Sequence, residues 1–328
     1  MGRRIAVTGA TGFIGRHVAA ALQARGDRVR AIVRPDSPRP APEGVEVARV
    51  PLTASALETA FAGCDTVVHL AGLVAAQRDA EYVAVNVDAT RAVAQASRTA
   101  NARLVHVSSL AAAGPAPQSR PRGEDDPPRP ITMYGITKLA GERAVTDTPG
   151  LRWTVLRPGV VYGSGDGALV PLVRLAALPV IPLVGRADGA YMFVHIDDLT
   201  RAILAAIDAE QDGLVCFVGH ASPVRPRELY DELRAIVHGR GRIVRVPAPV
   251  VWLIANAGEM AGLIARRTMV LDRRRYNELY SEGFVCRVDR LRERLGVTAA
   301  IGLHEGMKRS AEWYAARVRR SRGRATPD

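Results

Sequence analysis

The sequence predicts an α/β protein with a doubly wound parallel sheet and a smaller, mostly helical C-terminal domain. In the first half of the chain, short β-branched runs alternate with longer segments of helical periodicity, which is typical of βαβ units. After residue 158 this alternation gives way to glycine and proline punctuation. With 328 residues, of which 48% are hydrophobic and 24% charged, the chain has enough apolar surface for two domains, and a disordered chain is excluded.

The alternation places the individual elements. Strands are expected at residues 4–8, 28–33, 45–50, 66–70, 103–108 and 152–157. Helices are expected at residues 13–25, 54–62, 78–99 and 133–146. Six prolines in residues 114–130 predict a long loop of the functional or mobile kind.

The second half predicts a chain that leaves the sheet and returns. Residues 191–218 are expected to rejoin the domain of residues 1–158, through a helix at 194–209 and a strand at 214–218. The second domain then comprises residues 159–190 and 219–316. It is expected to contain one strand at 243–246 and helices at 227–237, 250–265, 289–295 and 303–316. Residues 317–328, rich in arginine and without an apolar period, predict a basic disordered tail.

Charge and cysteine content exclude several classes of protein. The chain has 45 basic and 33 acidic residues, a net charge of +12, but the arginines of the tail have no aromatic partners for stacking bases, so nucleic acid is not an expected partner. Cys64, Cys216 and Cys286 lie far apart, which predicts neither a disulfide framework nor a metal site. No targeting signal and no apolar run of ~18 residues is found, so we expect a cytoplasmic protein without a membrane span.

The segment Thr8-Gly9-Ala10-Thr11-Gly12-Phe13-Ile14-Gly15 follows the first predicted strand and opens the first helix. Glycines at this spacing allow a tight turn, close approach of the backbone to a pyrophosphate and close packing of the helix. The helix N-terminus adds free N–H groups for phosphate. The residues expected to bind a dinucleotide here are Gly9, Thr11, Gly12, Phe13, Ile14 and Gly15.

The end of the second strand indicates which nicotinamide cofactor binds. Arg34 stands where an acidic residue would accept the ribose 2′-hydroxyl of NAD, and an arginine there accommodates the 2′-phosphate of NADP. Arg16 is a second cation just behind the last glycine. These residues favour NADP over NAD; the alternative is that Arg34 is solvated and Asp36 contacts the ribose.

Tyr134 and Lys138 form a YxxxK pair on a predicted helix, where a spacing of four places both on one face. The ammonium is expected to lower the pKa of the phenol towards neutrality, so that it exchanges a proton with a substrate oxygen. Upstream, a strand ends in Ser108 and Ser109, at the edge of the sheet where a substrate carbonyl would lie. A turn-capping role fits Ser108 better than Ser109.

In their order along the chain, these motifs resemble the extended short-chain dehydrogenase/reductase superfamily, also called the NAD-dependent epimerase/dehydratase family. The resemblance also includes His69-Leu70-Ala71-Gly72, Asn86-Val87-Asp88-Ala89-Thr90, the segment from Arg157 to Gly163 and the segment from Phe193 to Asp198. It implies a Rossmann-type domain, a nicotinamide cofactor and a catalytic set of Ser109, Tyr134 and Lys138. The second domain, residues 159–190 and 219–316, is expected to bind the substrate.

By the same resemblance, Tyr134 transfers the proton, Lys138 also holds the nicotinamide ribose, and Ser109 binds the reacting oxygen. The remaining residues expected around the cofactor are Leu70, Ala71, Gly72, Val107, Pro158 and Val160. His69 is expected to be a packed strand residue rather than a base. Asn86 and Asp197 are expected to be structural, at a helix start and as a helix cap.

Two reaction classes remain. Sugar-nucleotide members of the family usually carry an arginine two residues before the phenylalanine that corresponds to Phe193, and this chain has Tyr191 at that position. Those members also tend to have an asparagine after the sixth strand, where this chain has Pro158. A phenol cannot replace a guanidinium on a diphosphate. The sequence therefore favours NAD(P)-dependent hydride transfer to or from an alcohol or ketone of a fairly apolar small molecule, as in the 3β-hydroxysteroid dehydrogenase and dihydroflavonol reductase branch. The alternative is an NDP-sugar epimerase or dehydratase that uses bound NAD transiently.

The helix expected at 250–265 has an apolar face, formed by Trp252, Leu253, Ile254, Met260, Leu263 and Ile264. Such a face packs on a core, lines a substrate pocket, forms a subunit contact or touches a membrane surface. A homodimer and a peripheral membrane contact both remain open at this point.

Overall fold

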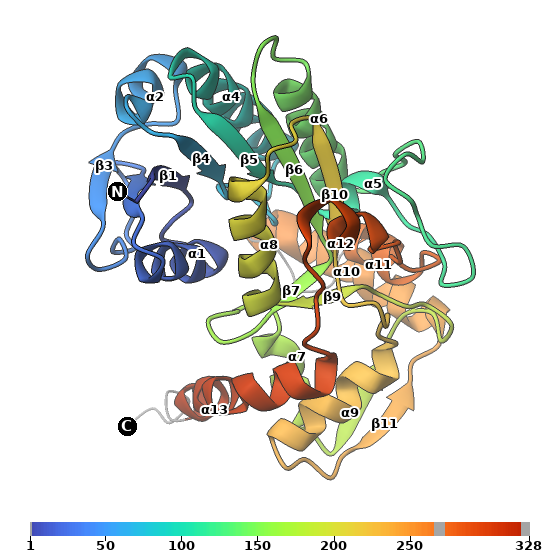
Figure 1. Cartoon of the computed structure of the whole chain (residues 1–328). Coiled ribbons are helices and arrows are strands. Elements are labelled where there is room, and N and C mark those ends of the chain that lie inside the picture. The colour runs from blue at the N-terminus through green and yellow to red at the C-terminus, as the bar shows by residue number, and fades with distance from the viewer. Residues whose placement is uncertain (1, 266–272, 323–328) are drawn as a thin grey trace.

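The computed structural model describes residues 2–265 and 273–322 (Figure 1). Seven strands form one sheet in the order β10-β6-β5-β4-β1-β2-β3, and every pairing in it is parallel. They are β1 (Arg4–Thr8), β2 (Arg28–Val33), β3 (Glu46–Arg49), β4 (Thr66–His69), β5 (Arg103–Val107), β6 (Trp153–Pro158) and β10 (Leu214–Val218). The chain runs outwards in opposite directions from β1 and β4, so the carboxyl ends of these two strands border the ligand-binding edge of such a sheet.

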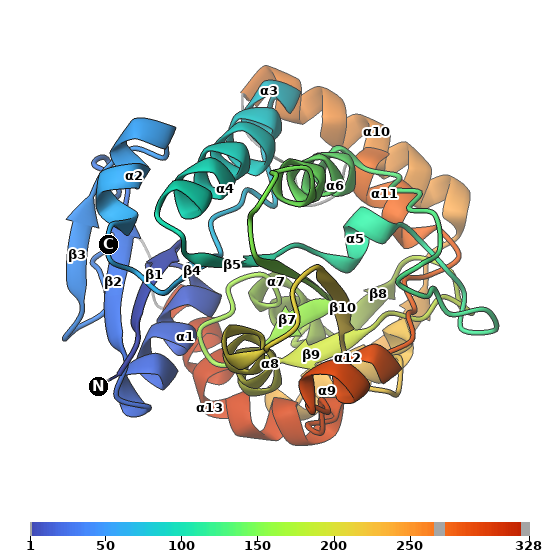
Figure 2. The same ribbon diagram turned by 45° about the horizontal axis from the view of Figure 1, so that its top comes forward.

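Helices cover both faces of the sheet, as Figure 2 shows. The helices α1 (Phe13–Ala24) and α8 (Ile196–Asp208) pack on one face, in a core that includes Val7, Val68 and Val105. The helices α2 (Ala54–Phe61), α4 (Ala89–Thr99) and α6 (Met133–Thr146) cover the other, above Val67, Leu104 and Val155. Side chains of successive strand residues point to opposite faces, and both faces are buried, which explains the continuous apolar runs in the sequence.

The predicted elements of the first half are confirmed, with one difference. The segment expected as one helix at 78–99 is α3 (Asp79–Val83), a π-helical turn η1 (Ala84–Asp88) and α4. A π turn inserts an extra residue into the helix and rotates the side chains that follow it. Periodicity along the sequence misses this local change.

The long loop of residues 114–130 is pinned to a distant part of the chain. Ala116 forms a parallel bridge with Phe284, and Arg122 forms one with Cys286. The Oε1 atom of Glu124 also accepts a hydrogen bond of 3.2 Å from the backbone N–H of Phe217 in β10. Prolines prevent regular structure in the loop, but its free N–H and C=O groups pair with the late segment.

The second part of the chain has a core of its own, which includes Tyr162, Ile181, Leu233 and Tyr314. Two small parallel sheets belong to it, β7 (Val160–Tyr162) with β9 (Phe193–His195) and β8 (Val180–Leu183) with β11 (Arg242–Arg245). Only β11 was expected from the sequence. The remaining helices are α5 (Leu110–Ala113), α7 (Val170–Ala176), α9 (Pro226–Ile236), α10 (Ala248–Ala265), α11 (Arg273–Leu279), α12 (Asp289–Leu295) and α13 (Leu303–Arg322).

Two predictions about helix ends are wrong. The helix expected at 194–209 begins at Ile196, because residues up to His195 form β9, and its N-cap is His195 rather than Asp197. The disordered tail was expected from residue 317, but α13 continues to Arg322. Arginine is a good helix former, the Arg317 guanidinium lies 5.0 Å from the ring centre of Trp313, and Val318 is buried in the core. The rest of the expected tail, residues 323–328, lies outside the described residues.

Among the helices that the structure describes, none combines the length and the hydropathy needed to cross a bilayer. Within the same residues, no group of His, Cys, Asp and Glu side chains is arranged to hold a metal ion.

Candidate active site

The glycine-rich turn lies between β1 and α1, at the carboxyl edge of the sheet. Gly9 has φ +71°, and a Cβ atom there would be 2.7 Å from the backbone nitrogen of Ala71. A Cβ atom at Gly15 would be 2.2 Å from the carbonyl oxygen of Gly9. Only glycine at these two positions allows the turn, the start of α1 and the end of β4 to lie this close together.

The turn and the start of α1 fit a dinucleotide. The N-cap of α1 is Gly12, which offers no side chain to the first N–H groups of the helix, and the first turn carries no acidic residue. The uncapped N–H groups and the positive end of the helix dipole are therefore available to a pyrophosphate. Thr11, Phe13 and Ile14 remain half-buried beside this terminus. These residues would hold the phosphates of a nicotinamide dinucleotide.

Arg34 follows the last residue of β2, as expected, and its side chain is 58% exposed. Its Nε atom lies 3.6 Å from Oδ1 of Asp36, so the two candidate ribose-binding side chains pair with each other. Arg16, on α1, donates a hydrogen bond of 2.7 Å to the carbonyl of Pro40. The cation nearest the strand end is thus Arg34, while Arg16 is held towards the loop after β2.

Tyr134 and Ser109 meet at the N-terminus of α6. Thr132 caps this helix with its side chain, and Ser109 caps α5 by accepting a hydrogen bond of 3.2 Å from the backbone N–H of Ala111. Burial raises the pKa of Tyr134 above its usual value, and a hydrogen bond with the Ser109 side chain opposes that rise. The phenol is therefore protonated at neutral pH and is held next to the serine hydroxyl.

Lys138 lies one turn further along α6 and is buried. Its Nζ atom donates a hydrogen bond of 2.9 Å to the carbonyl oxygen of Val107, the last residue of β5. Burial lowers the pKa of Lys138 to about 8, and the carboxylate of Glu142 works in the opposite direction. The ammonium was expected to lower the pKa of Tyr134. This expectation is wrong for the structure described, because desolvation of the phenol dominates and the lysine is turned to a backbone carbonyl.

Sequence reasoning missed the charged pair behind Lys138. Glu142 and Arg157 are both buried, and Arg157 forms a bidentate pair with the carboxylate, with N–O distances of 2.6 and 3.0 Å. Glu142 stands four residues after Lys138, so helical spacing alone places it on the same face of α6. Its partner comes from β6, and no local pattern links the two.

Two histidines lie on the same face of the sheet. His69 and His106 are paired across β4 and β5, and their rings stack with a centroid distance of 5.2 Å. His69 is packed, as expected: its Nδ1 atom is 2.7 Å from Thr8 Oγ1 and its Nε2 atom is 3.0 Å from Thr90 Oγ1. Burial and the charge of Lys138 lower the pKa of His69 to about 3, so it is neutral. Neither ring nitrogen of His106 has a hydrogen-bond partner among the described residues.

The segment Leu70, Ala71 and Gly72 follows β4 and remains partly exposed. Asn86 holds the next residue, Leu73, through two hydrogen bonds of 2.8 and 3.0 Å to its backbone, and donates a third of 3.1 Å to Thr137. The π turn carries Asn86, so it is a structural residue inside a helix rather than at a helix start.

The two serines differ from the expected order. Ser109 is the helix cap, whereas Ser108 was expected to be the cap. The Oγ atom of Ser108 is buried and has no partner among the described residues. Ser109 therefore both caps α5 and contacts Tyr134, because the chain turns from β5 into α5 at this residue.

The far side of the candidate site is formed by β6 and the strands after it. Pro158 is buried and Val160 is 39% exposed. Tyr191 stacks on Phe284 with a centroid distance of 6.3 Å, and its hydroxyl donates a hydrogen bond of 3.4 Å to the carbonyl of Leu279 in α11. The charge of Glu278, on the same helix, adds a smaller contribution to the raised pKa of Tyr134.

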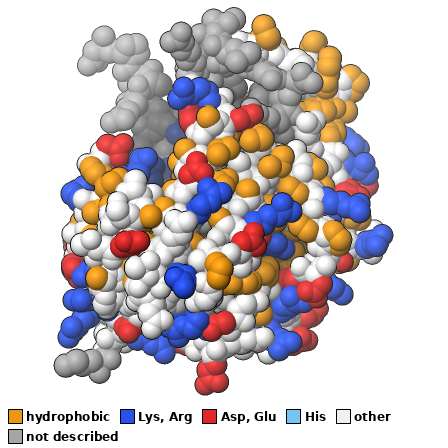
Figure 3. Space-filling model, turned by 90° about the horizontal axis from the view of Figure 1, so that it is seen from above, with side chains coloured by type: hydrophobic (Ala, Val, Ile, Leu, Met, Phe, Trp, Pro, Cys, Tyr) orange, Lys and Arg blue, Asp and Glu red, His pale blue; other side chains and the backbone are white. Residues whose placement is uncertain are grey.

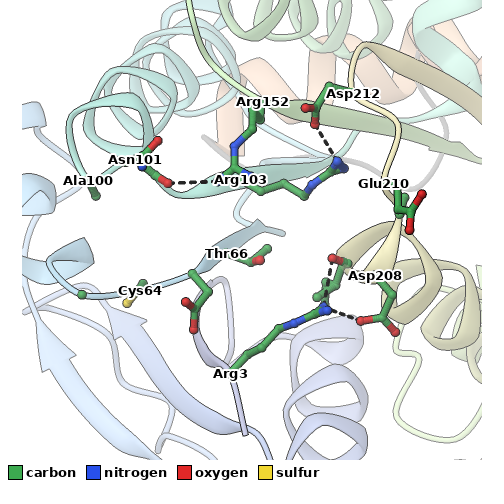
Figure 4. A pocket seen from close by; sticks show the side chains of 14 residues that line it. Arg3, Cys64, Thr66, Ala100, Asn101, Arg103, Arg152, Asp208, Glu210 and Asp212 are labelled. Carbon is green, nitrogen blue, oxygen red and sulfur yellow. Dashed lines mark hydrogen bonds and ion pairs between the residues drawn. The ribbon is translucent and has the colours of Figure 1, made fainter. Parts of the chain in front are cut away.

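A cavity of about 620 Å³ lies elsewhere, at the opposite edge of the sheet (Figure 4). Two ion pairs line it: Arg103 lies 2.6 Å from Asp212, and Arg3 pairs with Asp208. None of the candidate catalytic residues lines it.

Comparison with known proteins agrees with this arrangement. A model of the NAD dependent epimerase/dehydratase family matches residues 5–219. The chain is 32% identical over 324 residues to the ceramide reductase of Caulobacter vibrioides, covering 95% of this chain and 94% of that protein. It is 30% identical over 270 residues to the 4-hydroxy-2-methyl-3-oxo-4-farnesyl-3,4-dihydroquinoline-1-oxide ketoreductase of Stigmatella aurantiaca, covering 78% and 80%. Among solved structures, MoeE5 in complex with UDP-glucose and NAD has a TM-score of 0.77 and 27% identity, covering 97% of this chain and 99% of that one.

Proposed function

The chain belongs to the NAD dependent epimerase/dehydratase family and is an NAD(P)-dependent oxidoreductase, and on that premise we propose that its substrate is a ketone or secondary alcohol of a fairly apolar small molecule. We further propose that residues 1–158 with 191–218 bind the dinucleotide, and that residues 159–190 and 219–316 bind the substrate.

The observation that carries the substrate class is the side chain at position 191. Where sugar-nucleotide enzymes of the family use an arginine, this chain places Tyr191, stacked on Phe284. An aromatic surface of this kind favours an apolar substrate and offers no cation to a diphosphate. The names of two relatives, a ceramide reductase and a farnesylated quinoline ketoreductase, are in line with an apolar substrate.

We assign the proton transfer to Tyr134. Its phenol is protonated at neutral pH, so it is poised to donate a proton to a substrate carbonyl oxygen as that oxygen gains charge. Ser109, hydrogen-bonded to the phenol, binds the same oxygen. The nicotinamide, when bound, supplies or accepts the hydride. Lys138 would hold the nicotinamide ribose. If its ammonium group moves close to the Tyr134 phenol, the positive charge favours the phenolate and so assists proton release in the reverse reaction.

We propose NADP as the preferred cofactor. Arg34 stands directly at the end of β2, where a guanidinium pairs with a 2′-phosphate, and no carboxylate stands at that position. The carboxylate of Asp36 already forms an ion pair with Arg34, with an N–O distance of 3.6 Å. Replacing Arg34 with Ala is expected to weaken NADPH binding by roughly tenfold or more and to leave NADH binding within about twofold. Equal losses for both cofactors in a titration would overturn the preference.

The second candidate is an NDP-sugar epimerase or dehydratase. It is favoured by the likeness to MoeE5, whose structure holds UDP-glucose and NAD. The test is to incubate the protein with a long-chain aliphatic ketone and NADPH or NADH, and separately with UDP-glucose and oxidised NAD, and to follow both the absorbance of the reduced nicotinamide and the product. Stoichiometric loss of reduced cofactor with the ketone supports the reductase. Turnover of UDP-glucose with no net change in cofactor would support the epimerase and overturn the proposal.

A further inference from the structure

The exposed face of α10 carries more large apolar side chains than the solvent-facing side of a surface helix normally does. Val251 and Ala255 are buried, whereas Trp252, Leu253 and Ile254 are 51%, 65% and 50% exposed. Val250 and Met260 extend this surface, at 46% and 60% exposed. A helix that is apolar on all sides is normally covered on all sides, yet the residues that the structure describes cover only one side of α10. We call this surface the α10 face.

Exposed basic residues precede the α10 face in the chain. Residues 240–247 contain three arginines, Arg240, Arg242 and Arg245, and no acidic residue, and the one charged residue within α10 itself is Glu259. All three arginines are exposed. The strand pair β8–β11 that leads into α10 adds exposed Val180 and Val244 to the same stretch. Asp188, whose pKa is lowered in part by Arg245, is already paired with Arg186 at 2.6 Å.

The views of the whole molecule place this surface at one edge. In Figure 2, α10 runs along the upper right, next to α11 and on the same side as α6. Hydrophobic side chains gather at the upper right of the space-filling view, and both basic and acidic side chains lie below them (Figure 3). Bare apolar side chains that follow closely after exposed arginines in the chain are the chemistry of a helix that lies in the interface of an anionic membrane.

We propose that the α10 face docks onto the surface of a bilayer that contains anionic lipid. The apolar side chains enter the boundary between headgroups and acyl chains, Trp252 takes the interfacial position that tryptophan favours, and the arginines contact lipid phosphate. The competing occupant is a second copy of this chain, and the vesicle and oligomer measurements below separate the two.

The docked orientation brings the bilayer to the candidate site. The helix after α10 is α11, and its Glu278 acts on Tyr134 while its Leu279 carbonyl binds Tyr191. On α6, Ile136 is 46% exposed two residues after Tyr134, and Ile131 is 41% exposed just before the helix. An apolar molecule leaving the bilayer beside α10 would therefore reach α11 and its contact with Tyr191. The docking itself does not depend on which substrate the site takes.

The test is co-flotation of the full-length protein with vesicles of phosphatidylcholine alone and with about one third phosphatidylglycerol. Wild type is expected to float with the anionic vesicles, and about 0.5 M salt is expected to weaken the binding because it screens the arginines. Leu253→Glu is expected to reduce the partition by roughly tenfold or more. Arg240→Gln with Arg242→Gln is expected to reduce binding to anionic vesicles only.

The matched control is Val47→Glu, which makes the same change of charge at a side chain 42% exposed in β3. It is expected to leave flotation unchanged. Thermal unfolding and NADPH binding of each variant establish that the fold and the cofactor site are intact, so loss of docking is distinguished from loss of the oxidoreductase function. Absence of flotation with both vesicles, equal losses in Val47→Glu and Leu253→Glu, or a concentration-dependent dimer that Leu253→Glu dissociates without any vesicle binding would each overturn the proposal.

Discussion

The face of the sheet covered by α1 and α8 is apolar at the carboxyl ends of its strands, whereas the face covered by α4 and α6 changes from apolar to polar towards those ends. On the first face, β5 contributes Val105 and Val107. On the second, the same strand contributes Leu104 and then His106. Adjacent residues of one strand thus enter two different environments at the same depth.

The difference separates the part of the sheet that contributes stability from the part that carries the candidate catalytic residues. Burial of apolar side chains stabilises the fold without requiring a particular orientation of each side chain, but an unpaired charge buried among them is strongly destabilising. The polar end of the other face holds a buried lysine, a buried ion pair and two neutral histidines, each of which costs free energy unless it is partnered. Substitutions on the two faces should therefore change different measured quantities.

Tyr134→Phe should give the largest effect, on the polar side. Removing the phenol hydroxyl removes the proton donor, so kcat is expected to fall by roughly 10²–10⁴-fold. NADPH affinity and thermal stability should stay close to wild type, because the ring and its packing remain. Steady-state kinetics with a ketone substrate measures the loss, and turnover within a few fold of wild type would refute the assignment of Tyr134.

Arg157→Met should be next, in free energy of unfolding. It leaves the buried carboxylate of Glu142 without its guanidinium partner, and breaking a buried pair in this way costs about 3–5 kcal/mol. The double variant Arg157→Met with Glu142→Gln removes the unpaired charge and should recover part of that loss. Denaturant unfolding of the four proteins provides the cycle, and additive losses would show that the pair is not coupled.

Leu156→Ala tests the other face through the preceding residue of the same strand. Leu156 is fully buried in the apolar core, so the cavity and the lost burial should cost about 2–5 kcal/mol. The kcat of the folded variant should not change, since no polar group moves. A drop in kcat at a temperature where the variant is fully folded would mean that the two faces are not independent.

Glu142→Gln should give the smallest effect on catalysis, seen as a shift in pH dependence. Its cost in free energy of unfolding, from the Arg157 guanidinium left without a partner, is measured in the cycle above. Burial lowers the pKa of Lys138 to about 8, and the carboxylate of Glu142 acts against that lowering. Without it the pKa of Lys138 falls further, so the ammonium is lost at a lower pH. The alkaline limb of the kcat profile is expected to move down by about half to one pH unit. A limb that stays in place, or moves to higher pH, would contradict the role of this carboxylate.

The sequence allowed much of the sheet and part of the site to be predicted, for local reasons. β1, β2 and α6 lie where β-branched runs and helical periodicity place them, and the glycine turn needs no distant partner. What could not be predicted depends on contacts between remote segments. The strands β7 and β9 are three residues each and form only by pairing with one another, and the Arg157–Glu142 pair joins a strand to a helix.

Side-chain direction was the other limit. Spacing of four places Tyr134 and Lys138 on one face of α6, but it does not say that the ammonium reaches the carbonyl of Val107 instead of the phenol. Likewise, two adjacent serines at a strand end give no indication of which one caps α5. The three-dimensional turn after β5 decides both.

The loop of residues 114–130 has a consequence for synthesis on the ribosome. Ala116 and Arg122 bind backbone groups that lie beyond residue 282, so these pairings of the loop form only after that late segment has emerged. The return of the loop to α6 is closed by nearer groups, the N–H of Arg129 on the carbonyl of Ala113 and the Thr132 cap. A nascent chain released before Cys286 would therefore have the start of α6 in place while the middle of the loop still lacked its partners.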